Sequence, residues 1–410
     1  MTARIGLLGL GAMGAPMAER LVAAGFAPVV WNRSRSAVEP FRGRTPVAAT
    51  PAAAAAPVVL TMLTDLDGVL AVLDGPEGLR RGWRDAGVSD PVLVVMGTVS
   101  PVAVAELAAT LARDGIRLVD APVSGGVVGA AAGTLSIMVG GDPADVERAM
   151  PAFERLGSTI RHMGAVGSGQ LAKACNQLIV AASVTAISEA MLLARRTGLD
   201  LSALADILEG GLAGSEVLRQ KAANWLDEDF APGGSAVNQL KDLRFAADAA
   251  ASAGLSLPLA GVVQGLFAEL VADGDGDLDH TAVYRGIERR AAVGASEQSE
   301  KKENPMSEPV VVTAIFVPKE GARESVLAAL NTAIPDVHEE VGCLLYCIQE
   351  QNDGTIVMIE KWTSHELLDA HGVGQPVARL NAALEGLLER PVAVERLVPL
   401  PVGDPAKGAL

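Results

Sequence analysis

The sequence of 410 residues predicts a parallel α/β domain, then an all-helical domain, then a small α+β domain of the ferredoxin-like kind. Three observations lead to this prediction. Short apolar runs alternate with Ala-rich helical stretches up to about residue 165, which is typical of βαβ units. From Ser168 to about Arg290, helical spacing continues without a convincing strand. After a polar segment, strand and helix patterns follow in the order βαββαβ.

The elements of the first two domains follow from the spacing of apolar residues. Apolar runs between helical stretches predict parallel strands at Ile5–Leu8, Pro28–Trp31, Val58–Met62, Val92–Met96 and Arg117–Asp120. Apolar residues at helical spacing predict helices at Met13–Ala24 and Pro101–Ala112. In the second domain, Gln170–Thr197 predicts a helix of roughly 40 Å.

The domain boundaries follow from the changes of pattern. We expect domains at 1–165, 166–292 and 309–410. We expect a flexible linker at 293–308, because this segment is polar and charged and cannot bury apolar surface. In the third domain, the expected strands are Val310–Val317, Leu344–Glu350, Ile356–Trp362 and Val392–Leu400, and the expected helices are Arg323–Ala333, His365–His371 and Pro376–Leu388.

Composition excludes several classes of function. Half of the residues are apolar and 20% are charged, which is enough for folded cores. The net charge of −16 argues against a nucleic acid partner. The longest apolar runs are too short to cross a membrane, so no membrane span is expected. The three cysteines cannot form a disulfide framework or, without a neighbouring histidine cluster, a zinc site. These features predict a cytoplasmic protein without a metal.

A glycine motif directly after the first predicted strand indicates a dinucleotide site. It reads Gly9-Leu10-Gly11-Ala12-Met13-Gly14 and opens a helix, the context in which a pyrophosphate binds at a helix N-terminus of a Rossmann domain. The second strand ends in Asn32-Arg33-Ser34, where an NAD-binding protein has an acidic residue. Arg33 and Ser34 suit a 2′-phosphate, so the sequence predicts NADP(H) over NAD. The alternative is that Arg33 is a solvated loop charge.

Two further segments predict catalysis. Lys173 lies near the start of the long helix, where the helix dipole and burial favour its neutral form and let it donate a proton near neutral pH. Asn176 and Gln177 follow on the same side of that helix, where an amide can hydrogen-bond a substrate oxygen. Ser124, Gly125 and Gly126 can present a hydroxyl and main-chain N–H groups to a substrate carboxylate.

With these motifs, residues 1–290 resemble the β-hydroxyacid dehydrogenases of the 3-hydroxyisobutyrate dehydrogenase type. Gly210–Ser215 and Asn176–Val180 are most similar to the tartronate semialdehyde reductases. The resemblance implies that Lys173 is the catalytic lysine and that the cofactor is also lined by Met62, Leu63, Thr98 and Lys241. It implies NADPH-dependent interconversion of a small β-hydroxyacid and its semialdehyde. We expect a homodimer or homotetramer.

Two alternatives to this function are kept open. An imine reductase shares the fold and the use of NADPH, but generally lacks the lysine and the Ser-Gly-Gly segment. In that alternative the C-terminal domain would serve only for dimerisation. Some members of the family retain the fold as an oligomerisation scaffold without activity, and these members lose the lysine that is present here as Lys173.

The C-terminal domain resembles the antibiotic biosynthesis monooxygenase-like domains, which are small dimeric α/β barrels. The matching stretches are His338–Tyr346, Glu360–Trp362 and His371. Trp362, His338 and His371 are expected to line an apolar pocket, with histidine as a base towards a quinol or enol. The alternative is that Trp362 belongs to the core and both histidines are surface groups. The domain is then either a second enzyme or a dimerisation module.

Overall fold

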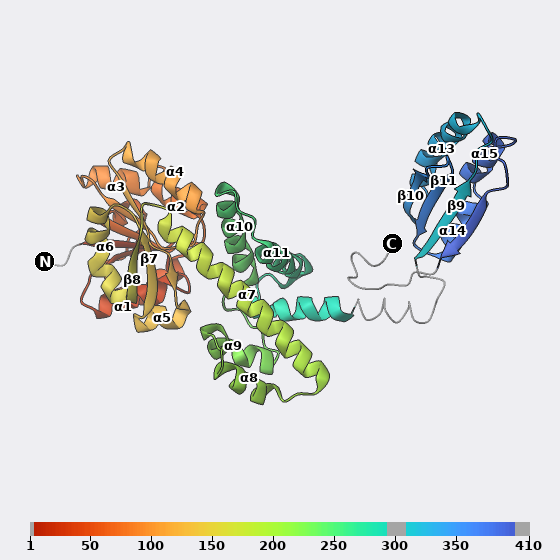
Figure 1. Cartoon of the computed structure of the whole chain (residues 1–410). Helices are drawn as coiled ribbons and strands as arrows, with labels where there is room; N and C mark the ends of the chain where they lie inside the picture. The colour runs from red at the N-terminus through yellow and green to blue at the C-terminus, as the bar shows by residue number, and fades with distance from the viewer. Residues whose placement is uncertain (1–3, 293–308, 398–410) are drawn as a thin grey trace. The chain divides into compact units, whose positions relative to one another are not determined.

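The computed structural model describes residues 4–292 and 309–397, which form two compact units with a boundary between Arg289 and Arg290 (Figure 1). Each unit is described by itself. The first unit contains an α/β sheet domain and a helical domain, and the second is a small α+β domain, which confirms the predicted fold class. The predicted linker at 293–308 lies outside the described residues.

The sheet of the first unit has the strand order β2-β1-β3-β4-β5-β7-β6, and β8 pairs with β7. The five predicted strands are confirmed as the parallel strands β1 (Ile5–Leu8), β2 (Val29–Trp31), β3 (Val58–Thr61), β4 (Val92–Val95) and β5 (Arg117–Asp120). Three further strands were not predicted: β6 (Val123–Ser124), β7 (Leu135–Gly140) and β8 (Gly157–Gly164). β6 has two residues, and β8 is mostly exposed, so neither has the apolar run of a buried strand.

Helices cover both faces of this sheet (Figure 1). Leu7 on β1 packs with α1 (Gly14–Ala23) and α6 (Pro143–Leu156), and α5 (Gly126–Ala132) lies beside α1. The side chains of successive strand residues point to opposite faces of the sheet, so the next residue, Leu8, points to the other face. There it packs with three further helices. These are α2 (Leu66–Leu73), α3 (Leu79–Asp85) and α4 (Pro101–Ala112); the short 3₁₀ turns η1 (Arg35–Phe41) and η2 (Ala52–Ala54) connect strands.

The helical domain is built on α7 (Ser168–Thr197), which begins two residues before its predicted start. The other elements are α8 (Leu201–Glu209), α9 (Glu216–Leu226), α10 (Ala236–Ser252), α11 (Pro258–Leu270), η3 (Val271–Asp275), η4 (His280–Ala282) and a helix at 283–292. Their core includes the fully buried side chains of Trp225, Phe267 and Tyr284. By length and composition alone, α7 is long and apolar enough to cross a membrane, a test that core helices also meet.

The second unit has the order β9-α13-β10-β11-α14-α15-β12, and its antiparallel sheet has the strand order β10-β11-β9-β12. Three helices pack on one face of this sheet around Trp362 and Leu330. The bounds are β9 (Val310–Phe316), α13 (Arg323–His338), β10 (Cys343–Glu350), β11 (Ile356–Trp362), α14 (His365–Gly372), α15 (Gln375–Ala383) and β12 (Ala393–Leu397).

Two helix ends in this unit were predicted wrongly. α13 continues through Pro335 to His338, because the buried Val337 extends its apolar face beyond the predicted end at Ala333. α15 ends at Ala383, five residues before the predicted end, since the chain turns at Leu384 and Leu387 to place Leu388 opposite Pro318.

Candidate active site

The glycine motif forms a tight turn between β1 and α1. Gly9 has φ of +95°, and a Cβ there would lie 2.3 Å from the Met62 carbonyl oxygen. A Cβ on Gly14 would lie 1.9 Å from the Gly9 carbonyl oxygen, whereas a Cβ on Gly11 would meet nothing within 4 Å. No side chain caps the first turn of α1, and that turn has no acidic residue. The turn therefore offers open space and free N–H groups, which fit a dinucleotide pyrophosphate.

The loop after β2 lies beside this turn. The Leu10 amide donates a hydrogen bond of 2.9 Å to Asn32 Oδ1, so Asn32 ties the two loops together. Arg33 is exposed and has no hydrogen bond or ion pair with any residue in 4–292 or 309–397. The Ser34 and Ser36 hydroxyls lie 2.8 Å apart, and Arg35 between them is also exposed. Sequence reasoning missed Arg35 and Ser36, although the repeated Arg-Ser pair signals both.

The other residues predicted to line the cofactor gather at the ends of β3 and β4. Lys241 on α10 donates from Nζ to the Thr64 and Thr98 carbonyl oxygens, at 2.6 and 3.1 Å. Met62 and Leu63 are half-buried under the glycine turn. A Cβ on Gly97 would lie 1.9 Å from the Leu63 carbonyl oxygen, so the loop after β4 is closely packed.

Two buried polar residues join the sheet to the start of α7, and sequence reasoning assigned neither of them a role. Asp120, at the end of β5, is fully buried and accepts hydrogen bonds of 2.7 Å from the amides of Gly167 and Gln170. Burial raises the pKa of Asp120, and these two hydrogen bonds oppose the rise. The Gln170 side chain bonds the Gly97 carbonyl oxygen and the Val99 amide. The loop after β4 is thereby fixed to α7.

The predicted Ser-Gly-Gly segment lies at this same junction. Ser124 ends β6, four residues after Asp120, and is half-buried. Gly125 and Gly126 have φ of +127° and +62°, a conformation that side chains other than glycine rarely adopt, and both are exposed. Lys173 is one helical turn beyond Gln170, so both predicted segments start from the Asp120 junction.

Lys173 is buried beside two other charged groups. Its side chain is only 8% exposed, and burial lowers its pKa from the ordinary 10.5 to about 8. The charge of Asp242 opposes this shift, and that of Lys241 adds to it. Asp242 is 6% exposed, and burial raises its pKa; its Oδ1 lies 3.7 Å from Lys241 Nζ and has no hydrogen-bond partner among the residues that the structure describes. The sequence analysis gave Asp242 no role, although Asp242 directly follows Lys241, which was expected to line the cofactor.

A chain of amide hydrogen bonds links α7 to Asp242. Asn176 Nδ2 donates to Gln177 Oε1 at 3.0 Å, and Gln177 Nε2 donates to Asp242 Oδ2 at 2.7 Å. Gln239 Nε2 in turn donates to the Gln177 carbonyl oxygen. The two predicted amides therefore lie together beside a buried lysine and a buried carboxylate. Such a group can hold and deliver one proton near neutral pH.

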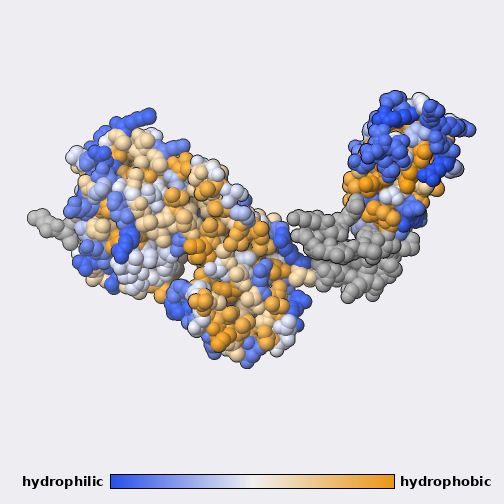
Figure 2. All heavy atoms as spheres, viewed as in Figure 1, coloured by the Kyte–Doolittle hydropathy of each residue, from blue (hydrophilic) through white to orange (hydrophobic). Residues whose placement is uncertain are grey.

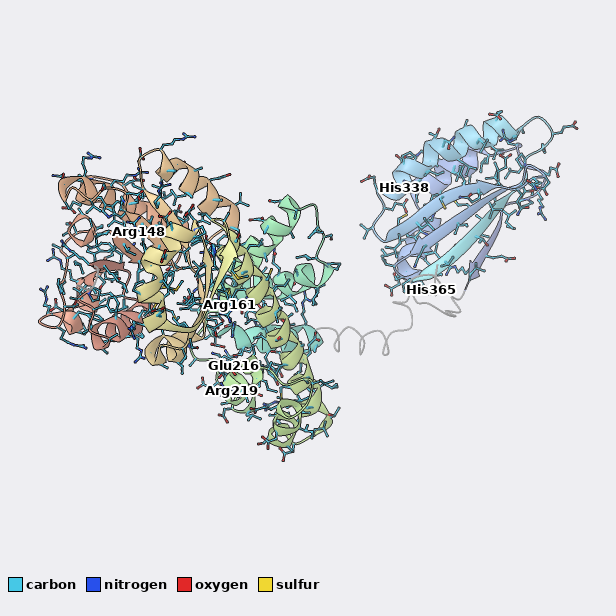
Figure 3. All side chains as sticks on the ribbon, turned by 60° about the vertical axis from the view of Figure 1, so that its left-hand side comes forward. Arg148, Arg161, Glu216, Arg219, His338 and His365 are labelled. Carbon is cyan, nitrogen blue, oxygen red and sulfur yellow. The ribbon has the colours of Figure 1, made fainter. Side chains whose placement is uncertain are left out.

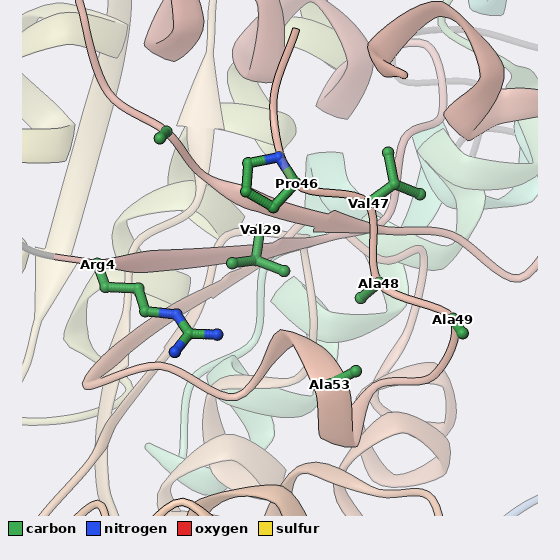
Figure 4. Close-up of a pocket in the computed structure, with 8 residues that line it drawn as sticks. Arg4, Val29, Pro46, Val47, Ala48, Ala49 and Ala53 are labelled. Atoms are coloured by element: carbon green, nitrogen blue, oxygen red, sulfur yellow. The ribbon is translucent and has the colours of Figure 1, made fainter. Parts of the chain in front are cut away.

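A separate pocket of about 460 Å³ lies at the amino ends of β1 and β2 (Figure 4). It is lined by Arg4, Ala27, Val29, Pro46, Val47, Ala48, Ala49 and Ala53. None of the predicted site residues is among them, and ligands of open α/β sheets bind at the carboxyl ends of the strands. Residues 4–292 and 309–397 contain no group of three His, Cys, Asp or Glu side chains that could hold a metal ion.

Of the three candidate site residues in the C-terminal unit, two are buried and one is exposed. Trp362 is fully buried in the core. His371 is buried too, so the alternative that both histidines are surface groups is wrong for this one. His338, the last residue of α13, is exposed, and its Nε2 lies 2.8 Å from the Tyr346 carbonyl oxygen (Figure 3).

Comparison with known protein families gives three matches. Residues 4–164 match the NAD binding domain of 6-phosphogluconate dehydrogenase, and residues 167–287 match the NAD-binding domain of NADP-dependent 3-hydroxyisobutyrate dehydrogenase. Residues 309–378 match the antibiotic biosynthesis monooxygenase family.

Individual relatives agree with the first two matches. The 2-hydroxy-3-oxopropionate reductase of Escherichia coli is 37% identical over 290 residues, which cover 70% of this chain and 98% of the relative. An NAD-dependent L-serine dehydrogenase of Pseudomonas aeruginosa is 34% identical, over 69% of this chain and 97% of its own. The solved 3-hydroxyisobutyrate dehydrogenase of Mycobacterium tuberculosis with L-serine has a TM-score of 0.60 and 34% identity, over 70% of this chain and 99% of its own. The chain therefore belongs to the 3-hydroxyisobutyrate dehydrogenase and 2-hydroxy-3-oxopropionate reductase family of nicotinamide-dependent oxidoreductases, with an antibiotic biosynthesis monooxygenase-like domain at its C-terminal end.

Proposed function

We propose that this chain reduces a small carboxylate-bearing aldehyde with NADPH, and in reverse oxidises the β-hydroxyacid. The observation that carries the proposal is the buried Lys173, whose pKa is lowered to about 8. At neutral pH this ammonium is still mostly protonated, and it gives up its proton more readily than an exposed lysine. Lys173 donates that proton to the carbonyl oxygen of the aldehyde during reduction. In the reverse direction, neutral Lys173 takes the hydroxyl proton.

The cofactor site is proposed from the loops at the carboxyl ends of the strands. The main chain at Gly9–Gly14 would hold the pyrophosphate, and Arg33 with Ser34 would hold the 2′-phosphate of NADP(H). Arg33 supports this choice because it is exposed and pairs with no other residue that the structure describes, and no acidic residue stands at 32–36 to repel a phosphate. When bound, the nicotinamide supplies or accepts the hydride.

The substrate site is proposed around Lys173. The exposed main chain of Gly125 and Gly126 and the Ser124 hydroxyl would hold the substrate carboxylate. Gln177 is held by Asp242, so one of its side-chain N–H groups and Oδ1 of Asn176 remain for a substrate hydroxyl. The similarity to a 2-hydroxy-3-oxopropionate reductase and to probable 3-hydroxyisobutyrate dehydrogenases supports tartronate semialdehyde or the semialdehyde of 3-hydroxyisobutyrate as the substrate.

The test removes the proton donor alone. We expect Lys173→Ala to lower kcat by about 10²- to 10⁴-fold, the usual contribution of one general acid, with the Kd for NADPH nearly unchanged. Stopped-flow reduction of a panel of semialdehydes and glyoxylate measures kcat, and quenching of NADPH fluorescence measures Kd. Lys319→Ala, on an exposed lysine of the C-terminal unit, is the matched control. Retention of most activity in Lys173→Ala would contradict the mechanism.

We also propose that the chain assembles as a homodimer or homotetramer. Large apolar side chains of the helical domain are exposed, among them Ile179, Leu193 and Ile207. Figure 2 shows hydrophobic (orange) atoms over the surface of this domain. Within residues 309–397, no helix packs on the second face of the C-terminal sheet, where Leu345 and Leu397 are exposed. Light scattering of the full chain after size exclusion tests this proposal. A monomeric mass at micromolar concentration would contradict it.

A further inference from the structure

The pocket at the amino ends of β1 and β2 is walled by small apolar side chains (Figure 4). Its volume of about 460 Å³ lies within the usual range of small-ligand sites. Seven of its eight lining residues are alanine, valine or proline, and the eighth is Arg4. The lining residues therefore offer a ligand apolar surface and one positive charge, and none of the eight is acidic.

Main-chain hydrogen bonds hold one side of this pocket in place. The segment 46–49 runs beside β2, where the Val30 amide donates to the Pro46 carbonyl oxygen and the Ala48 amide donates to the Val30 carbonyl oxygen, both at 2.9 Å. Ala53 lies on the 3₁₀ turn η2, and its amide donates to the Thr50 carbonyl oxygen at 3.1 Å. These bonds belong to the fold itself, so a ligand does not have to order this side of the pocket.

Arg4 reaches into the pocket with its guanidinium. Figure 4 shows the Arg4 side chain extending beneath Val29 in the direction of Ala53. Arg4 is exposed and has no hydrogen bond or ion pair with any residue in 4–292 or 309–397. The chain has 49 acidic and 33 basic residues, so a shortage of carboxylates does not explain this. The N–H donors of the guanidinium are therefore available to a ligand.

The combination of one guanidinium with apolar walls selects one class of ligand. A guanidinium binds a carboxylate through two parallel hydrogen bonds, and this geometry needs no second cation. A phosphate presents three oxygens, and none of the other seven lining side chains can donate a hydrogen bond to it. The alanine, valine and proline side chains favour a hydrocarbon chain, because contact with them removes apolar surface from water.

The pocket and the glycine turn lie at opposite ends of β1. Arg4 directly precedes this strand, and Gly9 directly follows it. The four residues of β1 span about 13 Å at the usual rise of a strand. A ligand in the pocket therefore does not overlap a dinucleotide that is held by the glycine turn.

We infer that this pocket binds an aliphatic monocarboxylate. The carboxylate pairs with the Arg4 guanidinium, and the hydrocarbon chain lies against Val29 and Ala53. The site is separate from the proposed reductase site, and its occupation does not depend on turnover.

The test titrates the full chain with octanoate and follows the broadening of the octanoate methyl resonance by proton NMR. We expect saturable binding. Acetate, which lacks the hydrocarbon chain, and octanamide, which lacks the charge, should each bind at least about tenfold more weakly. Saturating NADPH should leave the Kd for octanoate unchanged, because the glycine turn lies at the other end of β1.

Two variants test the two parts of the pocket. Arg4→Met keeps an unbranched apolar side chain and removes the guanidinium, and it should raise the Kd for octanoate by about tenfold. Ala53→Phe fills the space for the hydrocarbon chain and should weaken binding by a similar factor. Arg113→Met and Ala112→Phe are the matched controls, since both residues are exposed at the end of α4 and do not line the pocket.

Thermal unfolding checks that each variant is folded. Several results would overturn the inference: no saturable binding of octanoate, equal binding of octanamide or acetate, competition by NADPH, or an unchanged Kd in folded Arg4→Met or folded Ala53→Phe.

Discussion

Replacing Lys173 with methionine should stabilise the protein while it removes the proposed proton donor. Burial lowers the pKa of Lys173 from 10.5 to about 8, so the folded state holds its proton less tightly than the unfolded chain does. Integrated over pH, this difference costs the folded state about 3 kcal/mol near neutral pH. Methionine has a similar length and no charge to desolvate. We therefore expect Lys173→Met to raise the free energy of unfolding by about 3 kcal/mol at pH ~7.

The stability difference between Lys173→Met and the wild type should become smaller as the pH rises. Between the folded pKa of about 8 and the unfolded value of 10.5, the unfolded chain binds more protons, so wild-type stability rises with pH. The advantage of Lys173→Met is fully present below about pH 8 and shrinks to about 1 kcal/mol by about pH 10. Urea unfolding of the full chain, followed by the fluorescence of its four tryptophans, measures this difference at both pH values. Lys319→Met, on an exposed lysine of the other unit, is the control.

Two results would refute the reasoning. One is a Lys173→Met protein that is no more stable than the wild type near neutral pH. The other is a stability difference that does not change between neutral and alkaline pH, because the effect would then come from packing and not from a buried charge.

Three other predictions test the remaining contacts. Arg33→Ala should raise KM for NADPH by about 10- to 100-fold, because one charged hydrogen bond to the 2′-phosphate is lost, and KM for NADH by less than about twofold. Steady-state kinetics with both cofactors measure the two changes. An equal rise of KM for NADH and NADPH would contradict the 2′-phosphate role. Gly97→Ala should lower the free energy of unfolding by about 2 kcal/mol, since its Cβ would lie 1.9 Å from the Leu63 carbonyl oxygen; an unchanged urea midpoint would argue against the packing. Asp120→Ala should cost about 2 to 4 kcal/mol in the same assay, because two buried amides lose their acceptor, and a wild-type midpoint would rule that out.

The fold was predictable from the sequence wherever one element carries its own pattern. Three of the parallel strands, β1, β3 and β4, are buried along their whole length and therefore appear as almost continuous apolar runs. β8 pairs only with β7 and leaves most of its side chains exposed, so its sequence has no such run. A proline inside a helix generally breaks it, but α13 continues through Pro335 because Val337 packs in the core.

The sequence predicts those residues of the candidate site that belong to a local sequence pattern. Lys173 and the glycine motif belong to local patterns that follow one strand or open one helix. Asp242 belongs to the site only because of contacts with residues far away in the sequence: its hydrogen-bond partner Gln177 is 65 residues away, and its charge acts on Lys173, which lies on the same helix as Gln177. Pairings of this kind depend on how helices pack, and no spacing rule within one element encodes them.

Three side chains fix the loops of the site through main-chain atoms of those loops. Asp120 holds the amides of Gly167 and Gln170; Gln170 holds Gly97 and Val99; Lys241 holds the carbonyl oxygens of Thr64 and Thr98. The side chains at Thr64, Val99 and Thr98 take no part in these bonds. Substitutions at these three positions can therefore accumulate during evolution without moving the loops. The substrate specificity of the site can change in this way while the geometry of its loops stays the same.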